Sequence, residues 1–250
     1  MQKVSLIMTT FNSRDHFRLS LQSALAQDYP DLELVIADGA STDGTLQEIQ
    51  KAAALHENIR WVSEPDGGIY DGMNKGIRMS TGNIIAVFND LFTSPDCVTT
   101  MVRAIEEVPT CLGGHADLEY FDEKTGKSIR KWQMGTGTFR EGWMPGHPTL
   151  YLKREVYVKY GLYNTDYRVA ADYEFMVRSL RGQEEKLVYL HSTMIRMFYG
   201  GSSNGVRGYL TDISEAYRAL KENNCPHPAL VVAKRIGRTL QQYGDSRRKE

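Results

Sequence analysis

The chain has 250 residues, of which 41% are hydrophobic and 24% are charged, and its formal net charge is -1. This size suits one domain with a large core and an appendage, and the near-neutral charge argues against a nucleic-acid-binding protein. The three cysteines, Cys97, Cys111 and Cys225, form no CxxC pair, so the sequence predicts a reducing, cytoplasmic location without a disulfide framework. We expect neither a signal peptide nor a membrane span, because no uncharged apolar stretch approaches about 18 residues.

The first hundred residues alternate between strand and helix patterns. Apolar runs predict strands at residues 4–8, 32–37, 59–62 and 84–88. Apolar residues at helical spacing predict helices around residues 17–25, 46–49, 69–77 and 95–105, and Pro95 suits a helix start. This alternation predicts an α/β fold with a Rossmann-like, mainly parallel central sheet flanked by helices.

The second half has a less regular pattern. We expect strands at residues 112–120 and 128–133 around a turn at 123–126, helices at 153–160 and 172–180, and closing strands at 187–190 and 193–197. Glycine and aromatic residues at 135–146 indicate a functional loop. A glycine- and serine-rich break at 200–205 precedes two more helices, and the charged end at 247–250 is expected to fray.

Polar turns follow the first two predicted strands. Thr9, Thr10, Phe11 and Asn12 follow the first strand, and Asp38 ends the second. Ligands of open α/β sheets collect at the carboxyl ends of the strands, so these residues indicate a nucleotide site. Asp38 would accept hydrogen bonds from a base or ribose, although a helix cap is the alternative role for an aspartate here. Asp43 and Gly44 suit turn formation alone.

These turns belong to a series of motifs, which are residues 4–12, 23–27, 37–45, 64–76 and 80–83. In this order and spacing, the N-terminal half resembles the family 2 glycosyltransferases of the GT-A fold. His147, Pro148 and Thr149, together with residues 168–174, resemble a bacterial branch that builds polysaccharides. The resemblance covers roughly residues 1–205. It implies a catalytic domain at 1–205, with a nucleotide-sugar half at 1–110 and an acceptor half at 111–205, and a helical C-terminal extension at 206–250.

The resemblance implies a donor pocket and a metal. The donor-binding residues would be Thr9, Thr10, Phe11, Asn12, Asp38, Asp66, Gly68, Asn74, Asn89 and Asp90. Asp90 would hold Mn²⁺ or Mg²⁺, and the alternative for this aspartate is a simple turn carboxylate. The chain departs from the family at Asn89-Asp90, where two or three acidic residues are common, and at Asp38-Gly39, where adjacent aspartates are common. The first departure predicts weaker metal binding by the free enzyme. The second leaves open which nucleobase of the donor the protein binds.

Four further residues have roles that the resemblance implies. Asp172 would be the general base, although a carboxylate in a first helical turn also stabilises the helix dipole. Trp143 and His147 would contact the acceptor; their alternatives are core packing for Trp143 and a structural hydrogen bond for His147. Arg196, with the turn at 200–202, would lie near the donor phosphates, and the alternative is a surface arginine.

The expected activity is therefore inverting, metal-dependent transfer of a hexosyl or N-acetylhexosaminyl group. The donor would be a nucleotide-diphosphate sugar, expected to be UDP-linked, and the acceptor a glycan or lipid-linked oligosaccharide in bacterial surface polysaccharide synthesis. The basic amphipathic pattern at 229–244 predicts either a helix at the inner face of the cell membrane or one packed on its own domain.

Other function classes fit the sequence less well. A sugar nucleotidyltransferase needs a glycine-rich, basic loop after the first strand, and residues 9–13 form none. A dinucleotide-dependent oxidoreductase would have G-x-G-x-x-G after a strand, and this motif is missing. A non-catalytic sugar-binding partner is supported only by the thinned acidic turn at Asn89-Asp90, and the retention of Asp172 argues against it.

Overall fold

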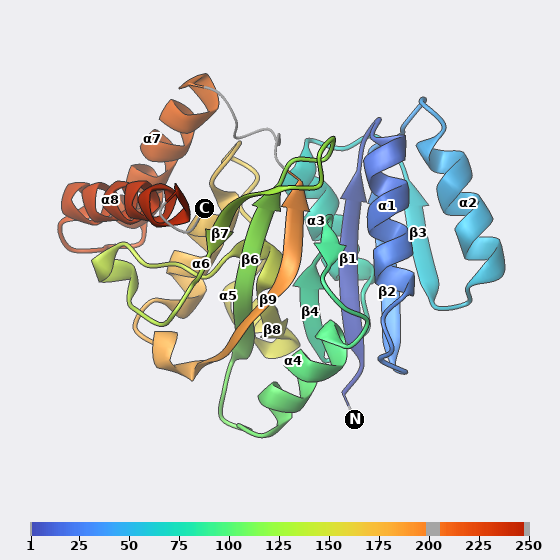
Figure 1. Ribbon diagram of the computed structural model, residues 1–250, viewed down its shortest axis with the longest axis horizontal. Helices are drawn as coiled ribbons and strands as arrows, with labels where there is room; N and C mark the ends of the chain where they lie inside the picture. Colours follow the sequence, from blue (N-terminus) through green and yellow to red (C-terminus); the bar gives the residue numbers. More distant parts are fainter. Residues whose placement is uncertain (1, 199–205, 248–250) are drawn as a thin grey trace.

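The computed structural model describes residues 2–198 and 206–247, and it shows an α/β domain with a curled central sheet (Figure 1). The expected break at 200–205 and the last residues of the expected frayed end, 248–250, lie outside the described residues. The strands are β1 (Val4–Thr10), β2 (Leu32–Asp38), β3 (Ile59–Ser63), β4 (Ile84–Val87), β5 (Leu91–Phe92), β6 (Gly113–Phe121), β7 (Ser128–Trp132), β8 (Tyr151–Lys153) and β9 (Leu187–Phe198). The α-helices are α1 (Arg14–Leu25), α2 (Thr45–Leu55), α3 (Ile69–Met79), α4 (Cys97–Glu106), α5 (Arg154–Tyr160), α6 (Ala171–Leu180), α7 (Val206–Glu222) and α8 (Pro228–Arg247). Short 3₁₀ helices are η1 (Phe139–Glu141), η2 (His147–Thr149) and η3 (Glu184–Lys186).

The sheet has the strand order β3-β2-β1-β4-β8-β6-β9-β5, with β7 paired to β6. The first four strands pair in parallel, so that their carboxyl ends meet at one edge. The C-terminal half adds antiparallel pairs at β8, β7 and β5, while β6 and β9 are parallel. The predicted α/β fold is confirmed, and parallel pairing dominates its N-terminal half.

Two apolar layers cover the faces of the sheet. Side chains alternate along β1, where Leu6 and Met8 face the layer of α1, α2 and α4. Ile7 faces the opposite layer, which α3, α5 and α6 form together with α7 and α8. Both faces of the inner strands are therefore buried, as continuous apolar runs in a parallel sheet predict.

Three strands differ from the sequence prediction. The expected strands at 187–190 and 193–197 form one continuous strand, β9, which accommodates a register shift opposite Asp117. The sequence did not predict β5 and β8, which have two and three residues. Such short strands have no apolar alternation of their own and form through pairing with β9, β4 and β6.

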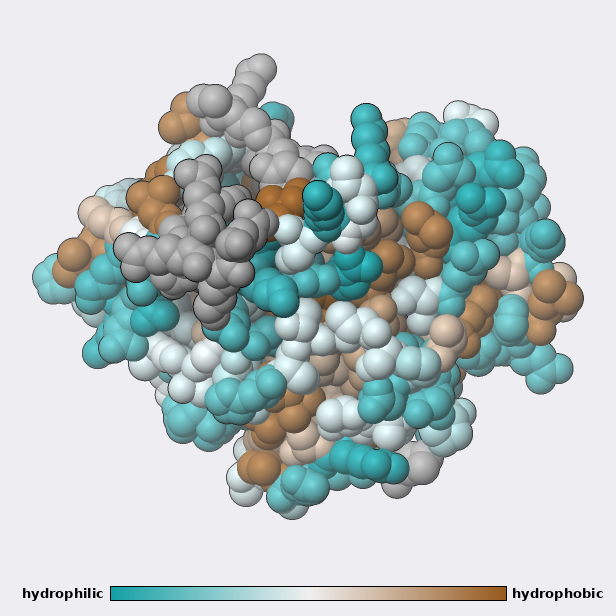
Figure 2. Space-filling view, viewed as in Figure 1, coloured by the Kyte–Doolittle hydropathy of each residue, from teal (hydrophilic) through white to brown (hydrophobic). Residues whose placement is uncertain are grey.

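Helices α7 and α8 pack against the preceding part of the chain. Ala216, Ala219 and Leu220 of α7 and Val231 and Val232 of α8 are buried in the same core layer as α6. In Figure 1 these helices lie at the end of the molecule opposite α2 and β3. Hydrophobic side chains are visible over these helices in Figure 2. Leu210, Leu230 and Leu240 are among the exposed apolar residues of the two helices. Within the described residues, no helix combines the length and the apolar character needed to span a membrane.

A buried carboxylate joins three segments at the edge opposite the carboxyl ends of the parallel strands. Glu33 of β2 is 3% exposed and accepts hydrogen bonds from the Ser5 hydroxyl at 2.5 Å and the Thr81 hydroxyl at 2.7 Å. The backbone N–H groups of Thr81 and Gly82 also donate to Glu33, and Lys3 forms an ion pair with it at 2.9 Å. Burial raises the pKa of Glu33, but these hydrogen bonds outweigh it and lower the pKa to about 2. Glu33 therefore stabilises the fold in its ionised form.

We expect Glu33→Gln to lower the free energy of unfolding at pH 7 by roughly 3 kcal/mol, because each pKa unit corresponds to about 1.4 kcal/mol. In the unfolded chain Glu33 has its ordinary pKa of 4.5, so the ionised side chain contributes its full stabilisation of the wild-type fold above that pH. It is lost as the pH falls from about 4.5 towards 2. Urea unfolding between pH 3 and 7 would measure this, with the exposed Glu57→Gln as control. A pH-independent difference would contradict this role for Glu33.

Candidate active site

The polar turns after the parallel strands meet at one edge of the sheet. Thr10 of β1 lies beside Asp38 of β2 in register, and Glu64, directly after β3, donates its backbone N–H to the Asp38 carbonyl at 3.0 Å. Asn12 has φ 45°, and its side chain accepts the Thr42 N–H at 2.8 Å while its own N–H binds the Ser41 hydroxyl. These bonds fasten the first turn to the second.

Asp38 is held by hydroxyl groups of the protein. It is 2% exposed, and its carboxylate accepts the Ser41 hydroxyl at 2.5 Å and the Ser63 hydroxyl at 2.6 Å. It is not the cap of the following helix, because α2 starts only at Thr45. Asp43 binds the Thr45 N–H and hydroxyl instead, which agrees with the turn role predicted for Asp43. Asp38 therefore orders the turn after β2.

Asp66 lies against two glycines. A Cβ at Gly39 would come within 2.9 Å of the Asp66 Oδ2 atom and 3.2 Å of the Phe11 ring, and one at Gly72 would be 3.4 Å from the same Oδ2. Asp66 also accepts the Gly68 N–H at 2.9 Å. Phe11 is 62% exposed, so a flat aromatic face stands beside the carboxylate at the surface. The small residues bring Phe11, Asp66 and the first turns of α3 together.

Asn89 and Asp90 follow β4. The Asn89 amide accepts the Thr9 N–H and donates to the Thr9 hydroxyl, both at 2.9 Å. Asp90 is 7% exposed and accepts the Phe198 N–H at 3.2 Å. Burial raises the pKa of Asp90 to about 7, although the Phe198 N–H and His16 lower it. Asp90 is thus a buried carboxylate whose environment in the protein does not fully compensate its charge.

Asp172 lies in the first turn of α6, as the sequence predicted. Its Oδ1 atom accepts the Tyr173 N–H at 2.8 Å and lies 3.1 Å from the Tyr70 hydroxyl. The Tyr70 hydroxyl also lies 2.6 Å from the Val169 carbonyl oxygen, so its proton is shared between the two. Burial and the neighbouring Asp172 raise the pKa of Tyr70, which keeps it protonated. Tyr70 and Gly72 are both in α3, which therefore connects Asp172 to the strand-end residues.

His147 and Trp143 stand near Asp172. The His147 Nε2 atom lies 2.8 Å from the Tyr163 hydroxyl, and burial lowers the pKa of His147 while Asp172 opposes this effect. The imidazole is therefore neutral at pH 7. Trp143 is 3% exposed, and its indole N–H donates to the Met134 carbonyl at 3.0 Å. Trp143 is thus a core residue, and it also lines a cavity that Asp172 borders.

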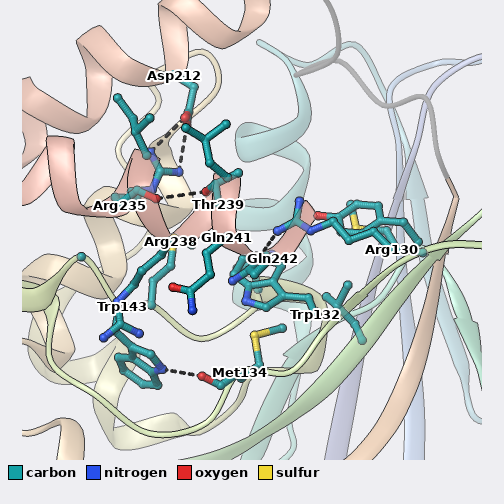
Figure 3. Close-up of a pocket in the computed structure, with 18 of the residues that line it drawn as sticks. Arg130, Trp132, Met134, Trp143, Asp212, Arg235, Arg238, Thr239, Gln241 and Gln242 are labelled. Carbon is teal, nitrogen blue, oxygen red and sulfur yellow. Dashed lines mark hydrogen bonds and ion pairs between the residues drawn. The ribbon is translucent and has the colours of Figure 1, made fainter. Parts of the chain in front are cut away.

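That cavity has a volume of about 700 Å³ and lies between β6, β7, the loop of η1 and η2, and the helices α7 and α8. Asp172, His147, Val169 and Trp143, which precede α7 in the chain, are among the residues that line it. Figure 3 shows Arg238 and Gln241 extending from α8 towards Trp143 and Met134. Asp172 therefore borders a partly apolar space that α8 helps to enclose.

Two predicted residues have interaction partners within the protein. Both ends of the Asn74 amide bind the Tyr163 backbone at 2.9 Å, and the side chain is 3% exposed. Arg196 forms an ion pair with Glu119 at 2.7 Å, and its guanidinium lies over the Phe121 ring. The turn at 200–202, with which Arg196 was grouped, lies outside the described residues. The donor contacts of Asn74 and Arg196 stay predictions.

Sequence reasoning missed several residues around Asp172. Tyr70 lies within a motif that the sequence analysis singled out, but nothing in the sequence relates it to Asp172, which is 102 residues away. Tyr163, Arg238 and Gln241 have no recognisable pattern. Glu215 lies in α7, outside the segment with family resemblance, and it contacts the residues directly before Asp172.

The chain matches the family described as glycosyl transferase family 2 over residues 5–159. An uncharacterized glycosyltransferase of Mycobacterium tuberculosis is 31% identical over 186 residues, which cover 70% of this chain and 68% of the relative. A second protein of that species, named as a glycosyltransferase of PGL/p-HBAD biosynthesis, is 29% identical over 210 residues, covering 81% of this chain and 79% of the relative.

Solved structures share the fold. TarS 1–349 of S. aureus, in complex with UDP, superimposes with a TM-score of 0.67 and 17% identity over 96% of this chain and 72% of that one. The mannosyltransferase PcManGT of Pyrobaculum calidifontis, in complex with GDP-Man and Mn²⁺, superimposes with a TM-score of 0.62 and 18% identity. The match covers 94% of this chain and 73% of that one. Both likenesses support the GT-A arrangement of the sheet and helices.

Proposed function

Because the chain belongs to glycosyltransferase family 2, we propose that it transfers a sugar from a nucleotide-diphosphate donor to an acceptor hydroxyl with inversion of configuration. The observation that carries this proposal is the position of Asp172. Its carboxylate faces a cavity of about 700 Å³ and is joined through Tyr70 of α3 to the strand-end residues. A donor at that edge and an acceptor in the cavity would meet beside one carboxylate.

The donor would bind at the carboxyl ends of β1 to β4. Phe11 offers an exposed ring for a nucleobase, and Thr9, Thr10, Asn12, Asp38, Asp66, Gly68 and Asn89 shape the surrounding turns. TarS has been crystallised with UDP and with UDP-GlcNAc, and PcManGT with GDP-Man. TarS supports a UDP-linked donor, so we propose UDP as the nucleotide and a hexosyl or N-acetylhexosaminyl group as the sugar.

We expect Gly39→Ala to weaken UDP binding about tenfold, or roughly 1.4 kcal/mol. The new Cβ would lie 2.9 Å from the Asp66 Oδ2 atom and 3.2 Å from the Phe11 ring, which would displace both groups. Gly67→Ala is the control, because its Cβ would make an ordinary contact of 3.8 Å with Asp71. Titration calorimetry with UDP measures both variants, and equal dissociation constants would contradict the proposed donor site.

A divalent cation would bind at Asp90. The donor set is one buried carboxylate whose charge the protein compensates incompletely, and hard cations such as Mg²⁺ and Mn²⁺ prefer oxygen ligands. Among the described residues, no group of three or more His, Cys, Asp or Glu side chains could hold a metal. Asp90 would therefore bind the cation together with the donor diphosphate. When bound, the cation would offset the negative charge of the leaving diphosphate.

Asp172 would act as the general base. Its carboxylate would accept the proton of the acceptor hydroxyl while that oxygen attacks the anomeric carbon in a single displacement. The hydrogen bonds from Tyr70 and the Tyr173 N–H would hold the Oδ1 atom, leaving Oδ2 for the acceptor. Neutral His147, anchored on Tyr163, would hydrogen-bond an acceptor hydroxyl, and Trp143 would contribute apolar surface.

The acceptor would be a glycan or a lipid-linked oligosaccharide of bacterial surface polysaccharide synthesis. The cavity suits such a molecule because apolar side chains such as Leu118, Met134 and Met197 line it together with polar groups of α8. We propose a cytoplasmic enzyme, in agreement with three buried, unpaired cysteines.

Contact with the inner face of the membrane through the exposed Leu230 and Leu240 of α8 stays a prediction. Liposome co-sedimentation of the full chain and a Leu230→Ser, Leu240→Ser variant would test it. Equal recovery of both in the supernatant would exclude this contact.

Donor hydrolysis tests the proposed function without knowledge of the acceptor. The purified protein is incubated with UDP-, GDP- and dTDP-sugars, with and without Mn²⁺, and the released nucleotide is measured. Metal-dependent release from one donor would support the proposal and identify the sugar. Nucleotide binding without turnover over a broad panel of acceptors would favour a non-catalytic binding partner. The single acidic residue in the turn at Asn89-Asp90 also agrees with that alternative. Turnover of a nucleoside triphosphate with a sugar phosphate would indicate a nucleotidyltransferase.

A further inference from the structure

Glu215 of α7 binds the backbone directly before Asp172. Its carboxylate is 9% exposed and accepts three backbone N–H groups, those of Arg168, Val169 and Ala170, each at 2.9 Å. Ala170 is the residue before α6, and its own side chain makes no capping hydrogen bond to that helix. Glu215 therefore satisfies three donors of the segment that leads into the catalytic helix, from a position more than 40 residues later in the chain.

The same helix holds this segment, residues 166–170, at two more points. Glu222 accepts the Tyr167 hydroxyl at 2.6 Å, and the Arg218 guanidinium lies 3.7 Å from the centre of the Tyr167 ring. On the opposite side, the Val169 carbonyl oxygen lies 2.6 Å from the Tyr70 hydroxyl, which also contacts Asp172. The segment is thus fixed between α3, which also borders the strand-end residues, and α7 of the C-terminal extension.

We propose that Glu215 is a positioning residue for Asp172, so that α7 is part of the catalytic apparatus rather than an appendage. This inference rests on the proposed function, in which Asp172 is the base. Without the Glu215 carboxylate, three N–H groups lose their partner, and the segment must move to satisfy them. Displacements of about 1 Å at a reacting group can cost a hundredfold in rate. Glu215 touches neither predicted substrate site directly, so its effect passes through the base.

The test compares Glu215→Gln with Glu222→Gln in the full chain, using nucleotide release from the active donor and UDP binding. Glu222→Gln is the matched control, because its one remaining side-chain oxygen can still accept the Tyr167 hydroxyl, whereas Glu215 uses both carboxylate oxygens to accept three N–H groups. We expect Glu215→Gln to lower kcat about 10- to 100-fold while the UDP dissociation constant stays within twofold. For Glu222→Gln, kcat and the UDP dissociation constant should both stay within twofold of the wild-type values. Glu215→Asp, which keeps the charge but shortens the side chain, should give an intermediate loss.

Two further measurements separate positioning from general destabilisation. Added to Asp172→Asn, Glu215→Gln should cause no further loss of kcat, since residues that act as a unit are not additive. Hydrogen exchange should become faster in peptides covering 166–172 and stay unchanged in β1 to β4. Multiplicative losses in the double variant, or wild-type exchange at 166–172, would overturn the proposal.

These outcomes also separate this inference from the proposed function. If Asp172→Asn keeps its activity, the assignment of the base fails, whatever Glu215→Gln does. If Asp172→Asn is inactive and Glu215→Gln keeps the wild-type rate, only the positioning role fails.

Discussion

Asp172→Asn is expected to lower kcat by about 10²- to 10⁴-fold, the contribution of a well-placed general base. Asparagine keeps the size of the side chain and can still accept the hydrogen bonds of Tyr70 and the Tyr173 N–H at its oxygen. It cannot take a proton from the acceptor hydroxyl. UDP affinity should stay within twofold, since the predicted donor contacts belong to the strand-end turns.

Single-turnover nucleotide release, with UDP titration alongside, would measure this change. Asp166→Asn is the matched control, because Asp166 is an exposed carboxylate six residues earlier in the same segment. The control should retain wild-type kinetics. A folded Asp172→Asn protein with near-normal turnover would falsify the assignment of Asp172 as the base.

Asp90→Asn should abolish metal-dependent donor turnover, with a loss of at least about a hundredfold, because the oxyanion charge of the leaving diphosphate would no longer be offset at this position. The melting temperature of the metal-free protein should not fall. Asp90 is buried with an incompletely compensated carboxylate, so a neutral amide of similar size removes an unfavourable charge. Loss of function without loss of stability is the signature of a functional carboxylate.

Nucleotide release and UDP titration, each with and without Mn²⁺, together with thermal unfolding, would measure these effects. Asp96→Asn is the control, because Asp96 is an exposed aspartate shortly after the same strand end. Manganese-enhanced UDP binding should persist in the control and disappear in Asp90→Asn. If Asp90→Asn still shows the manganese effect, the metal is held elsewhere.

The N-terminal half was largely predictable from sequence. Its strands and helices are long and strongly periodic, and the polar turns after them follow the rule that ligands collect at the carboxyl ends of parallel strands. The places of Thr9, Asp38 and Asp90 at one edge follow directly from this topology. The predicted position of Asp172 at the start of a helix was also correct, because the apolar pattern of α6 is regular.

The C-terminal half was less predictable for identifiable reasons. Strands β5 and β8 are too short to have a sequence pattern, and β9 looked like two strands because its register shift interrupts the apolar alternation. The sequence left two options for the helix at 229–244, the domain or the membrane. The structure packs α8 on the domain through Val231 and Val232, and its exposed side keeps the second option as a prediction.

The sequence by itself determined the α/β class and the family and singled out the carboxylates proposed for the chemistry, since local periodicity and motif spacing are properties of contiguous residues. Only the tertiary structure decided which groups surround those carboxylates. Tyr70 and Glu215 reach the Asp172 segment from 102 and 45 to 47 residues away, through α3 and α7. Such contacts depend on how the two helices pack on the sheet, and this packing is fixed by the whole core rather than by any local pattern.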